Sequence, residues 1–256
     1  AAAAGPDEAE AMRERMRKAL PFRRVTVTGA DALKEWERLR ALGEGWPVVI
    51  GGDEALDRIA EQFSLDDSSV FPQPTSAPAP RSPQAILSAA SGVKLPGALE
   101  TLWREEYGGD ADDEAMPAIG KWPAPTAALD PGFTIARDIM TGKPLARVHI
   151  LVLPTRDSAE VPAYLRWGGW NACPMPEIHV AVLRDWNRRY GVELVGIDGD
   201  TINLRATRRP ASRDEALALA REQFFYCPDI VYQGTDTLAP LAAGLMASDW
   251  WFFWWD

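Results

Sequence analysis

Only two cysteines occur in this chain, and each is followed directly by a proline. Pro174 and Pro176, which follow Cys173, are typical of the first turn of a helix. The Cys173 thiol would then lie at a helix N-terminus, where the helix dipole favours the thiolate form. His179 follows on the same predicted helix and could act as its base. Cys173 and His179 are therefore candidate catalytic residues of a thiol-dependent hydrolase or transferase.

The same residues also fit purely structural roles. Buried cysteines are common in protein cores, and His179 has apolar neighbours on its predicted helix face. Cys173 and Cys227 could instead form a disulfide in an exported protein, which would stabilise it by roughly 2–4 kcal/mol. In a reducing compartment both would be free core thiols. Cys173, His179, Cys227 and His149 could in principle bind zinc. No metal site is expected, because these four residues lack the closely spaced pairs typical of zinc ligands.

Aromatic and polar side chains near the two Cys-Pro steps are candidates for ligand binding. These candidates are Trp167, Trp170, Asn171, Asp229 and Gln233. An asparagine in a glycine-rich turn often bonds backbone groups, so Asn171 has a structural interpretation as well. Trp167, Trp170 and Trp186 are expected to be substantially buried, and they would mark a binding site if they lined an open cleft instead.

Composition restricts the class of function. The net charge of −10 and the sequence pI of about 4.8 disfavour a nucleic-acid binder, which needs a Lys/Arg surface. An acidic surface suits a basic protein partner, although many acidic surfaces serve only solubility. The chain has no Walker loop, Gly-x-Ser-x-Gly or His-Glu-x-x-His motif, and no cofactor is expected. These observations favour a non-enzymatic acidic binding module, such as an immunity-like protein that neutralises a basic partner. The thiol-dependent enzyme is the alternative.

One apolar segment could be mistaken for a membrane span. Residues 238–255 carry a single charge at Asp249, whose burial in a bilayer would cost roughly 2.5–3.5 kcal/mol. We therefore expect a helix over 237–247 and a strand over 250–255, and no integral membrane segment. The chain opens with four alanines, which is compatible with a cytoplasmic protein or with export and removal of a signal.

The N-terminal third alternates between predicted strands and helices. A β-α-β-α order over residues 21–63 predicts a small parallel α/β unit. Residues 64–98 are rich in Pro, Ser and Ala and predict a linker or a long surface excursion. The individual elements are a charged helical lead-in over 1–20, strands at 23–28 and 47–50, and helices that begin at Asp31 and Asp53.

The Trp-rich remainder, residues 99–256, predicts a mixed sheet with helices packed on it, which makes the fold class α/β of the mixed α+β kind. The aromatic strand over 250–255 is apolar on both faces, so we expect it inside the sheet, or half covered by a partner. The other predicted elements are a strand at 148–153, a helix at 176–190, a hairpin of 192–197 and 201–206, and a helix that begins with a Ser212/Glu215 capping box.

Two sequence blocks resemble a bacterial family known only as a domain of unknown function. They are Trp-Gly-Gly-Trp-Asn-Ala-Cys-Pro over 167–174 and Tyr-Cys-Pro-Asp over 226–229, and a Trp-rich end follows them. The resemblance covers roughly residues 148–256. The strand near Trp46 also looks like the N-terminal part of longer members. The resemblance implies a shared fold and brings no activity, so function has to be argued from the residues.

Overall fold

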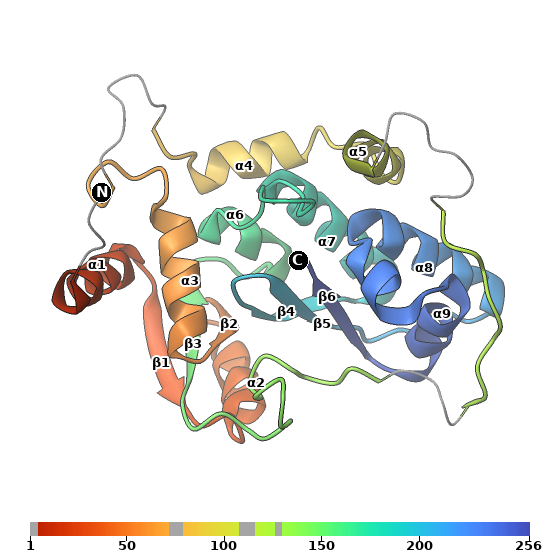
Figure 1. Ribbon diagram of the computed structural model, residues 1–256, viewed down its shortest axis with the longest axis horizontal. Coiled ribbons are helices and arrows are strands. Elements are labelled where there is room, and N and C mark those ends of the chain that lie inside the picture. The colour runs from red at the N-terminus through yellow and green to blue at the C-terminus, as the bar shows by residue number, and fades with distance from the viewer. Residues whose placement is uncertain (1–4, 72–78, 108–115, 126–129) are drawn as a thin grey trace.

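The computed structural model describes residues 5–71, 79–107, 116–125 and 130–256. In this part of the chain, six strands form one mixed sheet in the order β1-β3-β2-β4-β5-β6. Figure 1 shows helices packed around this sheet, which agrees with the predicted mixed α+β class. The strands are β1 (Arg23–Val27), β2 (Trp46–Gly51), β3 (Val148–Leu153), β4 (Glu193–Ile197), β5 (Thr201–Arg205) and β6 (Trp250–Trp254).

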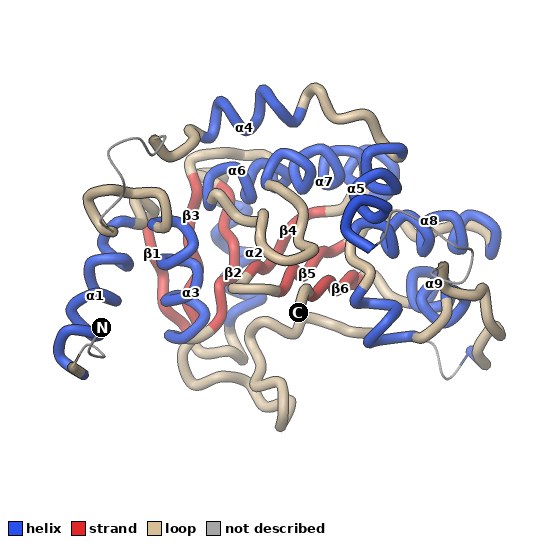
Figure 2. Tube along the Cα trace, turned by 45° about the horizontal axis from the view of Figure 1, so that its top comes forward, coloured by secondary structure: helices blue, strands red, loops and turns tan. Residues whose placement is uncertain are grey.

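Helices cover both faces of the sheet. In Figure 2, α3, α6 and α7 lie in front of the strands and α2 lies behind them. Short turns of 3-10 helix (η3, Ser158–Glu160) and π-helix (η4, Ile230–Thr235) connect some of the elements. The helices are α1 (Pro6–Ala19), α2 (Ala32–Leu42), α3 (Asp53–Ser64), α4 (Pro83–Ala90), α5 (Gly97–Tyr107), α6 (Val161–Leu165), α7 (Pro176–Tyr190), α8 (Arg213–Tyr226) and α9 (Leu238–Ala247).

The two N-terminal strands do not pair with each other. β1 and β2 lie on opposite sides of β3, and both are antiparallel to it. β2 is parallel to β4 instead, through Val49 and Gly196. β1 and β2 therefore run in the same direction, and the β-α-β-α order predicted over residues 21–63 is present. The two strands do not form the pair that a parallel unit requires, because β3 lies between them.

β6 lies at the edge of the sheet and pairs with β5 alone. The expected interior position is wrong, although both faces of the strand carry aromatic side chains. One face is buried, and Phe253 on it is fully inaccessible. The other face is half-buried, with Phe252 at its centre. An edge position is compatible with this composition because η4 packs beside the strand, and α9 packs against η4.

The predicted apolar face of α7 is confirmed. His179, Trp186 and Tyr190 are buried, and the Trp186 ring stacks on Phe253 with 5.4 Å between ring centroids. The Trp186 indole N–H donates to Glu222 at 2.6 Å, so the polar edge of this buried ring has a partner. The Trp-rich C-terminal region thus holds an aromatic core between α7, α8 and β6.

The Pro-rich stretch over 64–98 contains a helix that the sequence reading did not include. α4 begins with Ser82, whose hydroxyl accepts a hydrogen bond from the Ala85 N–H, and its Ile86 is buried against α6 and α7. Residues 72–78 of this stretch lie outside the described part of the chain. The helix at 83–90 shows that part of the expected linker packs against the C-terminal helices.

The apolar segment near the C-terminus divides as expected into α9 and β6. Among the described residues, none of the helices has the length and apolar character needed to cross a membrane.

Candidate functional site

Cys173, His179 and Tyr226 form a buried polar chain inside the aromatic core. The Cys173 sulfur lies 3.4 Å from Nε2 of His179, and Nδ1 of His179 lies 2.6 Å from the Tyr226 hydroxyl. The three side chains come from the loop before α7, from α7 and from the end of α8. None of them is more than 4% exposed. The structure therefore brings the two candidate catalytic residues together and adds a tyrosine that the sequence reading did not assign.

Burial decides the charge of this chain. Desolvation raises the pKa of the Cys173 thiol well above its ordinary value and raises that of Tyr226 as well. It also lowers the pKa of His179 to about 3. All three groups are therefore neutral near pH 7. The helix dipole that favours a thiolate at Cys173 is outweighed by the cost of a buried charge.

The hydrogen bonds also select the tautomer of His179. A buried tyrosine hydroxyl needs an acceptor, and Nδ1 of a neutral imidazole provides one for Tyr226. Nε2 then carries the proton and faces the Cys173 sulfur and the carbonyl of Pro174. In this tautomer the nitrogen beside the thiol has no lone pair to accept its proton. The chain is thus internally satisfied, as expected for a structural network.

Gly168 explains part of the Trp-Gly-Gly-Trp block. Its φ of 115° is rarely adopted by residues with a side chain, and a Cβ there would lie 2.8 Å from Nε2 of His179. The loop therefore passes closely over the histidine. Trp167 beside it is fully buried and donates from its indole N–H to the Asp198 carbonyl at 2.7 Å. Trp170 is half-buried and meets the Trp167 ring edge-on at 4.7 Å.

Both cysteines are free thiols in the structure. The Cys227 sulfur donates to the Trp254 carbonyl at 3.0 Å, whereas Cys173 contacts His179. The structure thus contains no disulfide between Cys173 and Cys227, and the two sulfur atoms contact different groups. The described residues contain no cluster of three or more His, Cys, Asp and Glu side chains arranged to hold a metal ion.

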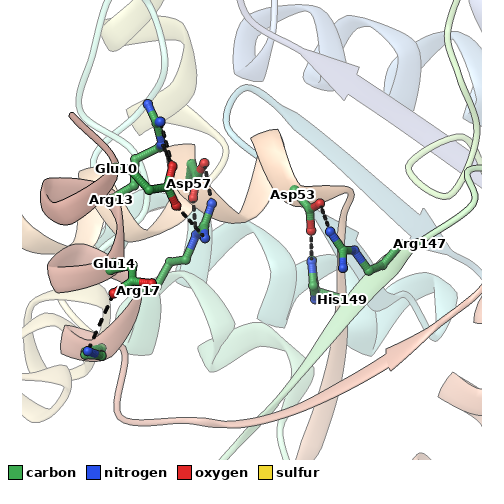
Figure 3. A network of polar contacts seen from close by, with 9 residues as sticks. Glu10, Arg13, Glu14, Arg17, Asp53, Asp57, Arg147 and His149 are labelled. Atoms are coloured by element: carbon green, nitrogen blue, oxygen red, sulfur yellow. Dashed lines mark hydrogen bonds and ion pairs between the residues drawn. The ribbon is translucent and has the colours of Figure 1, made fainter. Parts of the chain in front are cut away.

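His149 lies away from the cysteines, in a second polar network (Figure 3). Its Nε2 is 2.6 Å from Oδ1 of Asp53, which also pairs with Arg147, and its Nδ1 is 3.2 Å from the Thr26 hydroxyl. The hydrogen bonds from Arg147 and His149 lower the pKa of Asp53. These contacts connect the first residue of α3 to β3 and β1.

A pocket of about 210 Å³ lies beside Cys173, and we call it the cysteine pocket. Asn171 stands at its rim, and its amide donates to the backbone carbonyl of Asp256 at 2.8 Å. The φ of 45° at Asn171 is left-handed, a conformation that asparagine tolerates well. The side chain therefore joins the loop to residue 256, which supports its structural interpretation. The pocket is lined mainly by Trp103, Tyr107, Asn171, Cys173, Met175 and Phe225.

A second pocket of about 340 Å³ lies beside the edge of β6 that faces away from β5, and we call it the strand-edge pocket. Asp229 and Gln233, both predicted from the sequence to bind a ligand, meet in its wall. The Gln233 amide donates to Oδ1 of Asp229 at 3.1 Å, and the Asp256 N–H donates to Oδ2 at 3.1 Å. The polar and aromatic lining consists of Asp130, Gln223, Asp229, Gln233, Thr235, Trp250, Trp251, Phe252 and Trp254.

Gln223 is the member of this pocket that sequence reasoning missed. It lies on α8, is 1% exposed, and its Nε2 has no hydrogen-bond partner in the described part of the chain. A buried donor without a partner costs about 1–3 kcal/mol. A glutamine in the middle of a helix carries no sequence signal of burial, so only the packing of α8 identifies it.

The half-buried face of β6 is also incompletely covered. Trp250 meets the Phe133 ring at 5.4 Å and has the Arg205 guanidinium over it at 5.7 Å. The rings of Phe252 and Trp254 meet no other aromatic ring or cation among the described residues. The pocket thus combines open aromatic faces with an unsatisfied amide donor.

Comparison with known proteins found one family model that is similar to part of the chain. Residues 149–256 match the model of a family described as a domain of unknown function (DUF4253). The match agrees with the resemblance over residues 148–256, and it includes both cysteines and most of the residues that line the two pockets. No curated protein and no solved structure shows significant similarity to the chain.

Proposed function

We propose that this protein is a non-enzymatic binding module and that its ligand contacts the strand-edge pocket. The observation that carries the proposal is the buried Gln223 amide, whose donor lacks a partner at the pocket wall. A carbonyl or other acceptor of a ligand would supply that missing hydrogen bond. Other buried nitrogen atoms of the described residues also lack a partner, among them Nδ2 of Asn203 and Nε1 of Trp255, but Gln223 is the residue of this group that lines the pocket.

The remaining features of the pocket fit a recognition site. Its volume of about 340 Å³ falls in the range of ligand sites, roughly 300–1,000 Å³. Phe252 and Trp254 offer apolar surface, and Gln223, Asp229 and Gln233 supply a few polar groups that can fix orientation. Apolar walls with a few directed polar groups are typical of binding sites.

The charge of the protein favours a basic protein as the partner. A net charge of −10 produces a field that attracts basic proteins and accelerates their association. An immunity-like role, in which the module neutralises a basic partner by covering its surface, is the form of binding that we favour.

The proposal is tested by capture from the native host with matched variants. Wild-type protein, Gln223→Leu and Trp254→Ala are used as baits, and Met175→Ala in the cysteine pocket serves as the control. We expect the two strand-edge variants to capture roughly tenfold less of a specific protein, and the control to capture as much as the wild type. Equal capture by all four baits would contradict the proposal.

A thiol-dependent enzyme is the second candidate function, because Cys173 lines the cysteine pocket within 3.4 Å of His179. Cys173 would be the nucleophile and His179 its base. The raised pKa of the thiol and the tautomer of His179 oppose this function. Iodoacetamide labelling distinguishes the two: we expect native Cys173 to react at least tenfold more slowly at pH 7 than in urea. Equally fast labelling of the native protein, absent in Cys173→Ser, would favour the enzyme.

A further inference from the structure

We infer that the strand-edge pocket takes a single lysine or arginine side chain from an extended segment of a basic protein, with a neighbouring main-chain carbonyl of that segment on Gln223. This inference rests on the proposed function and names the group that the pocket recognises. Three observations support it: the acidic residues of the pocket, the aromatic rings of β6, and the hydrogen bonds already made at the edge of β6.

The charged groups of the pocket are both acidic. Asp130 and Asp229 line it, and its wall contains no lysine or arginine. Asp229 is 9% exposed, and its oxygens accept only from the neutral donors of Gln233 and the Asp256 backbone. Asp130 accepts from the Ser248 hydroxyl and the Gly132 N–H. Within the described residues, neither carboxylate has an ion-pair partner, so a cation in the pocket would meet two uncompensated negative charges.

Other aspartates of the molecule show what these two lack. Asp53 pairs with Arg147, Asp57 with Arg17, and Asp249 with Arg209. The chain has 27 lysines and arginines, and many of its carboxylates form ion pairs with them. The two carboxylates of the pocket are therefore available to a cation from outside.

The aromatic rings of β6 are suited to the same ligand. A guanidinium or ammonium group binds over the face of a tryptophan, and its aliphatic stem packs along apolar surface. Trp250 already demonstrates this contact, because the Arg205 guanidinium lies over its ring. Among the described residues, no cation lies over Trp254 or Phe252, and both line the pocket together with Asp229 and Gln223.

The edge of β6 is not free to accept a whole strand. The Trp250 N–H donates to the Ser248 hydroxyl at 2.9 Å, and the Trp254 carbonyl accepts from Cys227. The Asp256 N–H is bound to Asp229. Because backbone groups at both ends of the edge are already used, a partner cannot extend the sheet by strand addition. What remains is the space beside Phe252, which admits one side chain.

The test uses heptapeptides with identical alanine and leucine flanks and arginine, lysine, citrulline or glutamate at the centre. Citrulline has nearly the shape of arginine without its charge. Binding is followed by fluorine NMR on protein labelled with 5-fluorotryptophan, in which the Trp254 signal is assigned from Trp254→Phe. This readout detects weak binding. We expect the arginine and lysine peptides to bind roughly tenfold more tightly than the citrulline and glutamate peptides at low salt.

Variants without one carboxylate test whether Asp229 and Asp130 cause the preference for the cationic peptides. Asp229→Asn should reduce the arginine-to-citrulline ratio to about one, and Asp130→Asn should reduce it about threefold. Asp130 is exposed, so its variant remains informative if Asp229→Asn does not fold. Asp249→Asn removes a carboxylate outside the pocket and should leave the ratio unchanged.

Three outcomes would overturn the inference. These are equal binding of the arginine and citrulline peptides, no shift of the Trp254 signal by any peptide, or a shift on raising the protein concentration alone, which would identify a second copy as the occupant. The proposed function fails separately, when capture from the host is insensitive to Gln223→Leu. If capture from the host depends on Gln223 but the peptides bind without regard to charge, the proposed function is supported and the inference of a lysine or arginine side chain is wrong.

Discussion

The cysteine pocket and the strand-edge pocket share the segment 223–229, which contributes side chains to both, yet their polar groups differ in one respect. Beside the cysteine pocket, Cys173, His179 and Tyr226 satisfy one another in a closed chain. Beside the strand-edge pocket, Gln223 is equally buried, and its Nε2 has no partner among the described residues. The residues whose types suggest reactivity thus stabilise the core, and an ordinary glutamine is the group left unsatisfied.

The largest expected effect separates the two faces of β6. Phe253 is fully buried in the aromatic core, whereas the adjacent Phe252 is half-buried at the pocket. Phe253→Ala should reduce the free energy of unfolding by about 3–5 kcal/mol, because it leaves a cavity among well-packed rings. Phe252→Ala should cost about 1 kcal/mol or less. Urea denaturation of both variants measures the difference, and equal losses would show that the pocket face belongs to the core.

An intermediate effect concerns pH. The pKa of His179 is lowered to about 3 in the folded protein, so the unfolded chain binds its proton more readily. This contribution to stability is full above pH 6.5 and is lost as the pH falls toward 3. Between pH 7 and pH 5 we expect the free energy of unfolding of the wild type to fall by about 2 kcal/mol relative to that of His179→Gln.

The comparison with His179→Gln is needed because another buried acid acts in the opposite direction. Burial raises the pKa of Asp198 to about 6, so its contribution to stability increases as the pH falls through 6. Asp198 is present in both proteins, and the difference between their urea midpoints isolates His179. Identical pH profiles would show that His179 is accessible to protons in the folded state.

The smallest expected change in stability is at Gln223. Gln223→Leu removes an unsatisfied buried amide and keeps the volume nearly constant, so the free energy of unfolding should change by less than about 1 kcal/mol. Asn203→Leu is the matched control, since Nδ2 of Asn203 also lacks a partner among the described residues, whereas its Oδ1 accepts from the Thr134 N–H and hydroxyl and from the Ile135 N–H. Its loss should cost about 2–4 kcal/mol. A large loss at Gln223 as well would mean that its amide has a structural partner after all.

Local features of the fold could be predicted from the sequence. The apolar face of α7 follows from helical spacing, and Ser212 does accept from the Glu215 N–H at the start of α8. The strand β3, the hairpin of β4 and β5 and the division between α9 and β6 also appear where expected. These features depend on neighbours a few residues apart, which a sequence pattern records directly.

Pairings between distant strands could not be predicted in the same way. Nothing local in β1 and β2 indicates that β3 lies between them, and the composition of β6 suits an edge with side cover as well as an interior place. The site shows the same division. Asp229 and Gln233 were found because they are polar residues beside a Cys-Pro step, whereas Gln223 became visible only through the packing around α8.

The position of β3 between β1 and β2 has a consequence for how the chain folds as it is synthesised. Roughly a hundred residues separate Gly51 from Val148, so the first two strands emerge long before the strand that joins them. At about 5–20 residues per second, they wait for on the order of 5–20 s with their backbone groups unpaired. Sheets closed by such distant contacts fold slowly, because the entropy of a long loop is lost before any pairing energy is gained. An N-terminal fragment that ends before residue 148 should therefore lack a sheet and be prone to aggregate.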